Sequence, residues 1–265
     1  MYELSYDNLI SEAEAEEYLS TKYKGSIGNC TSVFNSTGLL GRNLDWYYSN
    51  LAEFIIHTPS TATTHASVCI GGNIPGLTDE AVSSGKSSDS YKYLPYTVVD
   101  GVNDDGLGIS VNVVPTDSIY GRTTGTNLGK PGMCMLRIVR YVLDHHDDID
   151  EAIEDLSNNW NIYSPSGSLN QEFHFLICKG STSKVIEFIN NTLVVPEDVR
   201  QDVITNFRVY NTELSGGIVD KTTVEDYGMG IERYNIILDS ITSNSIPVDW
   251  NLLDSLRYTN SYNPS

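Results

Sequence analysis

The sequence predicts an α+β fold built on antiparallel sheets. After a first helical segment, strand-like segments are followed by helical segments, and this order is then repeated toward the C-terminus. Short turns rich in Gly, Asn and Ser connect neighbouring strands, which is typical of antiparallel pairing. The 265 residues are enough for a sizeable hydrophobic core, and the sequence contains neither an internal repeat nor a linker-like stretch.

The first element that we expect is a helix. Residues 1–25 are interpreted as one helical segment, because Ser11 and Glu14 supply a capping box. Gly25 is expected to end the helix. The segment is acidic and amphipathic, so we expect it to dock on the domain that it precedes.

From residue 26 the apolar pattern changes to the short period of β-strands. The Gly- and Ser-rich residues 72–92 are expected to be a long loop, and residues 97–114 are expected to be a hairpin. The turn of that hairpin is Asn103-Asp104-Asp105-Gly106, which is a good turn signal. The other strands expected in this half cover residues 26–35, 39–45, 53–58 and 66–71.

The second half of the chain is expected to contain both helices and strands. Lys130-Pro131 is expected to open a helix that continues to about Leu143. Further helices are expected at residues 149–156, 231–241 and 248–257. Strands are expected at residues 172–178, 184–189 and 192–195.

The charge balance excludes several kinds of partner. Sixteen basic residues against 35 acidic residues give a formal net charge of −19. Such a surface repels nucleic acids and anionic membranes, so neither is expected as a partner. No apolar run approaches the roughly 20 residues that a membrane-spanning helix needs. Met1-Tyr2-Glu3-Leu4 lacks the basic and apolar regions of a secretory signal, so we expect no signal peptide and a cytoplasmic protein.

Three of the four cysteines are expected to be buried apolar side chains. Cys69 and Cys178 lie in strand-like runs, and Cys134 lies in a helical run. The cysteine spacing is unlike a metal-binding or disulfide pattern. His145-His146-Asp147-Asp148 contains metal-binding residue types, but it lies between two helices and no other ligand cluster accompanies it, so we expect no metal and no other cofactor. His174 alternates with apolar neighbours and is expected to be a core histidine rather than a base.

The remaining cysteine, Cys30, has a reactive sequence context. It lies in Gly28-Asn29-Cys30-Thr31-Ser32 within a predicted strand, and Ser36-Thr37-Gly38 supplies the turn that follows. The returning strand carries Arg42 and Asp45, which a hairpin this short brings back toward Cys30. A cation beside a thiol stabilises the thiolate, so this arrangement predicts a cysteine nucleophile.

Cys30-Thr31-Ser32 followed by Gly41-Arg42-Asn43-Leu44-Asp45 resembles the linear amide C–N hydrolases of the choloylglycine hydrolase and acid ceramidase type. These proteins are N-terminal-nucleophile (Ntn) hydrolases, in which the catalytic cysteine is the first residue of the mature chain. The resemblance implies a four-layer αββα sandwich of two mainly antiparallel sheets. It also implies that residues 1–29 are a helical propeptide, removed by autocleavage before Cys30, and that residues 30–265 form the Ntn-hydrolase domain.

Three further positions match the family in the same order along the chain. Asn112 and Asn206 take the places of the two oxyanion-hole asparagines, and Arg233 takes the place of a second arginine that opens a late helix. The resemblance implies that both asparagines donate hydrogen bonds to the tetrahedral oxyanion, while Asp45 orients the α-amine of Cys30. For Arg233 two roles are left open, namely support of this network and support of the leaving group.

The expected function is that of a self-processed N-terminal-cysteine hydrolase, which cleaves a linear, non-peptide amide C–N bond through an acyl-thioester on Cys30. The resemblance implies a small-molecule substrate of the bile-salt, penicillin V or N-acyl amide type. Two alternatives stay open: an acyltransferase that uses the same thioester, and a catalytically silent acidic binding domain that keeps the fold. The sequence also leaves open whether the chain forms a homo-oligomer.

Overall fold

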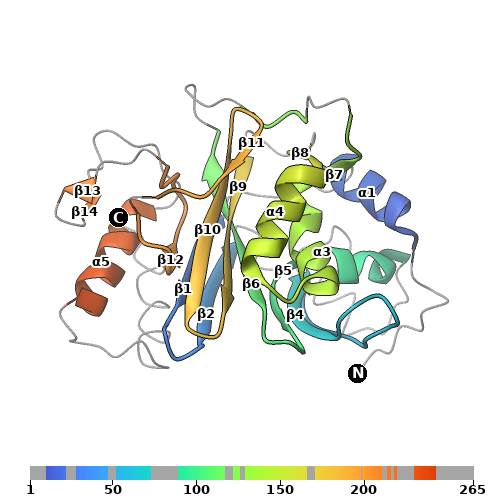
Figure 1. Cartoon of the computed structure of the whole chain (residues 1–265), viewed down its shortest axis with the longest axis horizontal. Helices are drawn as coiled ribbons and strands as arrows, with labels where there is room; N and C mark the ends of the chain where they lie inside the picture. The colour runs from blue at the N-terminus through green and yellow to red at the C-terminus, as the bar shows by residue number, and fades with distance from the viewer. Residues whose placement is uncertain are drawn as a thin grey trace. The chain divides into compact units, whose positions relative to one another are not determined.

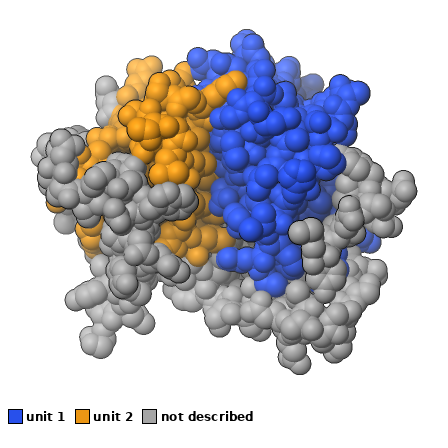
Figure 2. Space-filling model, turned by 90° about the horizontal axis from the view of Figure 1, so that it is seen from below, with its two compact units in different colours: residues 1–26, 48–109, 124–169 blue, residues 27–47, 110–123, 170–265 orange. Residues whose placement is uncertain are grey.

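The chain divides into two compact units, which Figure 2 shows in different colours. The first unit contains residues 1–26, 48–109 and 124–169, and the second contains residues 27–47, 110–123 and 170–265. The residues that the computed structural model describes are 10–21, 28–46, 52–72, 89–116, 122–125, 129–165, 171–197, 199–210, 214–215, 218–219 and 230–242.

The described residues of the first unit form three α-helices and an antiparallel sheet, together with shorter elements. Its helices are α1 (Glu12–Thr21), α3 (Ile138–His145) and α4 (Ile149–Asn159), with the 3-10 helices η2 (Asp89–Tyr96) and η3 (Met135–Arg137). Its strands are β3 (Glu53–Thr58), β4 (Ser67–Gly72), β5 (Val98–Asn103), β7 (Gly132–Cys134) and β8 (Asn161–Tyr163). The first residues of β6 (Gly108–Pro115) also belong to it, and the strand order is β6-β5-β4-β3.

Helix α3 packs on β5 in this unit (Figure 1). Its buried residues Ile138, Val139 and Val142 recur at helical spacing and form one apolar face. The helix comes close to the strand at Gly101, where an added Cβ would lie 2.9 Å from Cδ1 of Leu143. The small residue in β5 therefore makes room for the helix.

The described residues of the second unit form strands and one α-helix. Its elements are β1 (Gly28–Phe34), β2 (Leu40–Trp46), β9 (Gln171–Lys179), β10 (Thr182–Ile189), β11 (Thr192–Val194), β12 (Val203–Ile204), β13 (Leu214–Ser215), β14 (Ile218–Val219) and α5 (Gly230–Thr242). The part of β6 from Ser110 onward also belongs to it.

Two antiparallel sheets and a helix form layers within the second unit. One sheet has the order β12-β1-β2, and the other has the order β11-β10-β9-β6. Helix α5 packs on β1, and β12 packs on β9, so the smaller sheet lies between α5 and the larger sheet (Figure 1). The apolar core of this unit includes Val33, Leu176, Ile204, Phe207 and Ile237.

A tight turn joins β1 to β2. The Asn35 side-chain oxygen accepts hydrogen bonds from the main-chain nitrogens of Thr37 and Leu39, over 3.1 and 2.9 Å. Gly38 has a φ of +89°, which a residue with a side chain rarely adopts. The sequence Asn-Ser-Thr-Gly thus provides both the side-chain acceptor and the conformational freedom that this hairpin needs.

The predicted α+β class with antiparallel sheets is confirmed. The predicted hairpin at 97–114 is present as β5 and β6, and its turn ends with Gly106 at a φ of +81°. The helix expected at 149–156 begins where predicted and continues to Asn159. Within the described residues, no helix is both long and apolar enough to cross a membrane.

The helix expected to start at Lys130 is wrong in its first turn. Residues 132–134 instead form β7, which pairs in parallel with β8, and the α-helix begins only at Ile138. The main-chain nitrogen of Cys134 donates to Oε1 of Glu16 over 2.6 Å, which also holds this segment extended. Cys134 is therefore a strand residue, although it is buried as expected.

Some further expectations need correction, and others lie outside the described residues. Residues 89–92 belong to η2 rather than to a loop. The strands β8 and β12 were not predicted, because elements of two or three residues are too short to show a period. Outside the described residues lie 1–9 and 22–25 of the expected first helix, loop residues 73–88, and the helix expected at 248–257.

Candidate active site

The β1–β2 hairpin brings Arg42 to Cys30. The two strands pair with Cys30 opposite Leu44 and Ser32 opposite Arg42, so Arg42 lies diagonally across from the cysteine on the same face. Its NH2 lies 3.8 Å from Sγ of Cys30 and donates to the carbonyl oxygen of Val111 over 2.7 Å. Cys30 itself is 1% exposed. The predicted cation is therefore in contact with the predicted nucleophile, and β6 holds it there.

Asn206 contacts the main-chain nitrogen of the same cysteine. The nitrogen of Cys30 donates to Oδ1 of Asn206 over 2.6 Å, and Nδ2 of Asn206 donates to the carbonyl oxygen of Val113 over 2.7 Å. Both the asparagine and the cysteine are buried. This asparagine thus binds the atom that becomes an α-amine if the chain is cut before Cys30.

Arg233 comes from the first turn of α5 and is 2% exposed. Its NH1 donates to the carbonyl oxygen of Cys30 over 2.5 Å and to Oγ1 of Thr31 over 2.6 Å. Its NH2 donates to Oδ1 of Asn206 over 2.6 Å. Of the two roles that the sequence leaves open, these contacts favour support of the network around Cys30.

Asn112 lies on β6 and reaches β1 through Ser32. Its Oδ1 accepts a hydrogen bond from Oγ of Ser32 over 3.1 Å, and its Nδ2 donates to the carbonyl oxygen of Ile204 over 3.0 Å. Ser32 and Cys30 have the same side-chain direction because they are two residues apart on one strand. Asn112 therefore joins the residues around Cys30, although its described contacts are to Ser32 and β12 rather than to Cys30.

The side chain of Asp45 lies outside the described residues. Its main chain pairs opposite Asn29 in the hairpin, next to the pair formed by Cys30 and Leu44. Asp45 is thus placed by register beside the bond that the resemblance implies is cut. Its expected role in orienting the α-amine of Cys30 stays a prediction.

Two site residues were missed as participants in the sequence analysis. Thr31 accepts from Arg233, and Ser32 donates to Asn112. Both side chains are fully buried. The sequence could have indicated both residues, because both belong to the Cys-Thr-Ser stretch that carries the resemblance.

The histidines of the sequence analysis have structural partners. His174 is fully buried, with Nδ1 3.0 Å from Oε1 of Glu187 and Nε2 2.9 Å from the carbonyl oxygen of Thr205, so the expectation of a core histidine is confirmed. In the segment His145-His146-Asp147-Asp148, the Asp148 side chain caps α4.

One group with metal-binding residue types is found in the part of the chain that the structure describes. It consists of His65, Asp104 and Asp105, and Nδ1 of His65 lies 2.6 Å from Oδ2 of Asp105. Both carboxylates are well exposed, as is common for acidic groups that hold no ion. It lies in the first unit and includes none of the predicted site residues.

Comparisons with known proteins show the family to which the chain belongs. The family model of the linear amide C–N hydrolases, choloylglycine hydrolase family, matches residues 30–232. The match covers well over half of the chain and begins at Cys30. The chain therefore belongs to the choloylglycine hydrolase family of linear amide C–N hydrolases.

A curated relative supports the same family. Penicillin V acylase from Pectobacterium atrosepticum is 28% identical over 124 residues, which are 45% of this chain and 32% of the relative. The chain thus matches about a third of the length of that relative.

Solved structures show the fold. The conjugated bile acid hydrolase from Clostridium perfringens, as an arginine-to-leucine variant, is 16% identical and has a TM-score of 0.52, covering 88% of this chain and 78% of that one. A cysteine-to-alanine mutant of the same hydrolase is 17% identical with a TM-score of 0.52, covering 88% and 79%. At this identity the likeness concerns the fold alone, and it agrees with the predicted Ntn architecture of two antiparallel sheets.

Proposed function

We propose that this protein is a self-processed N-terminal-cysteine hydrolase that cleaves linear amide C–N bonds through a thioester on Cys30. Two contacts carry the proposal: NH2 of Arg42 lies 3.8 Å from Sγ, and the nitrogen of Cys30 donates to Asn206 over 2.6 Å. A cysteine used only for packing needs no cation beside its sulfur, although its buried main-chain nitrogen still needs an acceptor. In an Ntn hydrolase both contacts have a chemical use, because the sulfur is the nucleophile and the nitrogen of the same residue becomes the base.

The proposed substrate class comes from the family and its relatives. The family acts on linear amides, and the relatives are named as a penicillin V acylase and a conjugated bile acid hydrolase. We extend the proposal to a small N-acyl amide as the substrate. Penicillin V and conjugated bile acids are the compounds to test first.

Self-processing in this proposal uses the same sulfur as the later turnover. Sγ of Cys30 attacks the carbonyl carbon of Asn29, the C–S bond forms as the C–N bond breaks, and the thiol proton moves to the departing nitrogen. Water then hydrolyses the thioester, which leaves a carboxylate on Asn29 and a free α-amine and thiol on Cys30. Pairing with β2 holds the bond on both sides, with Asp45 opposite Asn29 and Leu44 opposite Cys30.

In turnover, the α-amine of Cys30 accepts the thiol proton while Sγ attacks the amide carbonyl of the substrate. The proton then passes to the leaving amine, the C–N bond breaks, and the acyl group remains on sulfur as a thioester until water releases it as a carboxylic acid. Arg42 supplies positive charge beside the thiolate. The amide nitrogens of Asn112 and Asn206 each carry two hydrogens, so each has one for the oxyanion besides the one that it donates to a main-chain carbonyl.

Intact mass spectrometry of the purified chain tests the proposal, followed by a fluorescamine assay for amine released from penicillin V and conjugated bile acids. The wild type is expected to be cut between Asn29 and Cys30 and to release amine. Cys30→Ala is expected to stay uncut and inactive. Cys178→Ala removes another buried thiol of the second unit, so it serves as the matched control and is expected to behave like the wild type. A wild-type chain that stays uncut and releases no amine would refute the proposal.

A further inference from the structure

His174 and Glu187 form a buried pair on the neighbouring strands β9 and β10. Both side chains are 0% exposed, and Nδ1 of His174 lies 3.0 Å from Oε1 of Glu187. The strands are antiparallel with Phe175 opposite Ile186, which places the pair at the next position of the register. Burying such groups is costly unless their polar atoms have partners, so the other contacts of the pair indicate what it is for.

The chemistry of the partners shows where one hydrogen of the pair lies and which atom donates in three of its hydrogen bonds. The carbonyl oxygen of Thr205 can only accept, so Nε2 of His174 carries a hydrogen and donates it over 2.9 Å. Glu187 accepts from the main-chain nitrogen of Val209 at Oε1 over 3.0 Å and from that of Tyr210 at Oε2 over 2.9 Å. A further proton lies between Nδ1 and Oε1, on one atom or the other.

These contacts hold both ends of the segment 205–210. The segment follows β12, which ends at Ile204, and it is buried up to Val209 without belonging to one of the named strands. Irregular buried main chain lacks the regular hydrogen bonds of a helix or sheet, so side chains often supply its partners. Thr205 is held a second time, because its Oγ1 donates to the carbonyl oxygen of Gly230 over 2.8 Å.

Asn206 lies inside the segment that the pair holds. Its Oδ1 accepts from the nitrogen of Cys30 over 2.6 Å, while neither His174 nor Glu187 has a described contact with Cys30. The main chain of Asn206 also has little free space, since a Cβ on Gly230 would lie 3.0–3.2 Å from its N, C and Cα atoms. Because Asn206 directly follows Thr205 in the chain, a shift of Thr205 also moves Asn206 relative to Cys30.

We propose that His174 and Glu187 are positioning residues for the nucleophile: they fix the segment 205–210 and through it set Asn206 against the nitrogen of Cys30. The inference rests on the proposed function, because that nitrogen matters only as the base of an Ntn hydrolase. A misplacement of about 1 Å in such a site costs roughly 100-fold in rate. The pair acts on rate through geometry, and substrate binding is left to other residues.

Three substitutions in the full-length chain test the proposal. His174→Phe keeps a ring but removes both nitrogens, whereas His174→Gln keeps an N–H that can donate toward Thr205. Asn103→Ala is the matched control, because Asn103 is also buried and holds main chain at the end of α3 and in the β5–β6 turn through three hydrogen bonds, all within the first unit. The readouts are kcat and KM for penicillin V per folded molecule, and the distance from Asn206 to Cys30 in a crystal structure of each variant.

We expect kcat of His174→Phe to fall about 10- to 100-fold with KM within about twofold of the wild type, and His174→Gln to recover part of the loss. Asn103→Ala is expected to lower the melting temperature and to keep kcat.

The inference would be overturned if His174→Phe kept the wild-type kcat, or if the contact between Asn206 and Cys30 were unchanged in the crystal structure of this variant. If His174→Phe does not fold, the same readouts on His174→Gln and Glu187→Gln decide it. A wild type that stays uncut and releases no amine refutes the proposed function, and the crystal structures then decide this inference separately.

Discussion

Arg233 donates a hydrogen bond to the carbonyl oxygen of Cys30 over 2.5 Å, although the two residues are 203 positions apart in the chain. The same guanidinium contacts Oγ1 of Thr31 and Oδ1 of Asn206. Asn206 in turn accepts from the nitrogen of Cys30. The main chain on both sides of the cysteine Cα is therefore held by one connected set of buried hydrogen bonds.

Replacing Arg233 by Lys is expected to lower the stability of the fold. A lysine ammonium cannot reach all three acceptors at once, so one or more buried oxygens lose their partner, at about 1–3 kcal/mol each. Urea unfolding monitored by circular dichroism measures the change. Arg200→Lys is the matched control, because Arg200 is 36% exposed and pairs with Asp202 near the surface, where such a pair contributes less than about 1 kcal/mol. Equal losses in the two variants would contradict the prediction.

Replacing Arg42 by Gln is expected to lower kcat/KM for penicillin V by about 10- to 100-fold. The reason is the loss of a positive charge 3.8 Å from Sγ of Cys30, since hydrogen bonds to charged groups contribute about 1.5–3 kcal/mol. Iodoacetamide labelling of Cys30 is expected to slow in parallel, because alkylation also needs the thiolate.

Arg140→Gln is the control for this prediction. Arg140 is buried, and its NH1 lies 3.6 Å from Sγ of Cys69 in the first unit. Burial raises the pKa of the Cys69 thiol, with Arg140 acting in the opposite direction, and this cysteine has no place in the proposed chemistry. The control is expected to lose stability and to keep kcat/KM. If both arginine variants lose activity equally, the charge beside Cys30 has no special role.

The sequence predicted the strands around the site because they are long enough to show a period. The β1–β2 hairpin carries its own turn signal at residues 35–38, and its register alone brings Arg42 to the face of Cys30. Asn206 and Arg233 were found only through the family resemblance, since nothing local in the sequence links them to the cysteine.

The contacts that the sequence could not predict join short or distant segments. Strand β7 was mistaken for a helix because its partner β8 lies far along the chain, and three residues show no period. His174 was expected only to be a core histidine, since its contact with Thr205 spans 31 residues and reaches an irregular segment.

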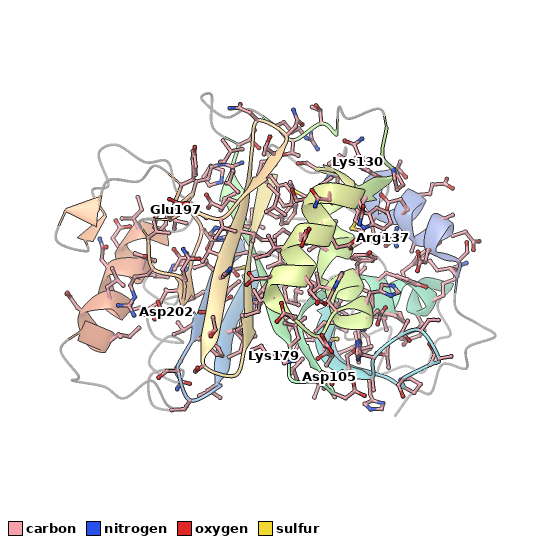
Figure 3. All side chains as sticks on the ribbon, in the orientation of Figure 1. Asp105, Lys130, Arg137, Lys179, Glu197 and Asp202 are labelled. Atoms are coloured by element: carbon pink, nitrogen blue, oxygen red, sulfur yellow. The ribbon has the colours of Figure 1, made fainter. Side chains whose placement is uncertain are left out.

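Glu16 fixes helix α1, which lies within the predicted propeptide, to the rest of the first unit. Its carboxylate accepts from Arg137 over 2.8 Å, from the nitrogen of Cys134 over 2.6 Å, and from the hydroxyl of Tyr163. Figure 3 shows Arg137 beside α1, and its side chain is only 8% exposed. Removal of this carboxylate leaves a buried cation without its main partner, which typically costs 3–5 kcal/mol.

Glu16→Ala is therefore expected to lower the melting temperature clearly, while Glu17→Ala on the exposed side of the same helix is expected to change it little. Differential scanning calorimetry of the uncut Cys30→Ala chain measures both without interference from processing. Equal melting temperatures for the two variants would mean that the contacts of Glu16 do not hold α1 in place.

Alkaline pH is expected to destabilise the fold through its buried tyrosines. Burial raises the pKa of Tyr234 to about 12, and Asp202 adds to this while Arg200 opposes it. The phenol of an unfolded chain ionises near pH 10, whereas the folded chain keeps its proton, so stability is fully present below about pH 10 and falls as pH rises toward 12. One such tyrosine lowers the free energy of unfolding by up to about 1.4 kcal/mol per pH unit.

Tyr234→Phe tests whether Tyr234 causes this loss of stability. The variant keeps the aromatic ring that packs edge-on against Phe207, with 5.1 Å between the ring centroids. Urea unfolding at pH 7 is expected to give nearly the wild-type free energy, within about 1 kcal/mol, since only a hydroxyl is lost. Between pH 10 and 11 the variant is expected to lose about 1 kcal/mol less stability than the wild type. The stability of Tyr234→Phe will still fall with pH in this range, because Tyr18 and Tyr141 also have pKa values raised to about 12 by burial. Identical slopes for the two proteins would show that Tyr234 ionises as easily in the folded chain as in the unfolded one.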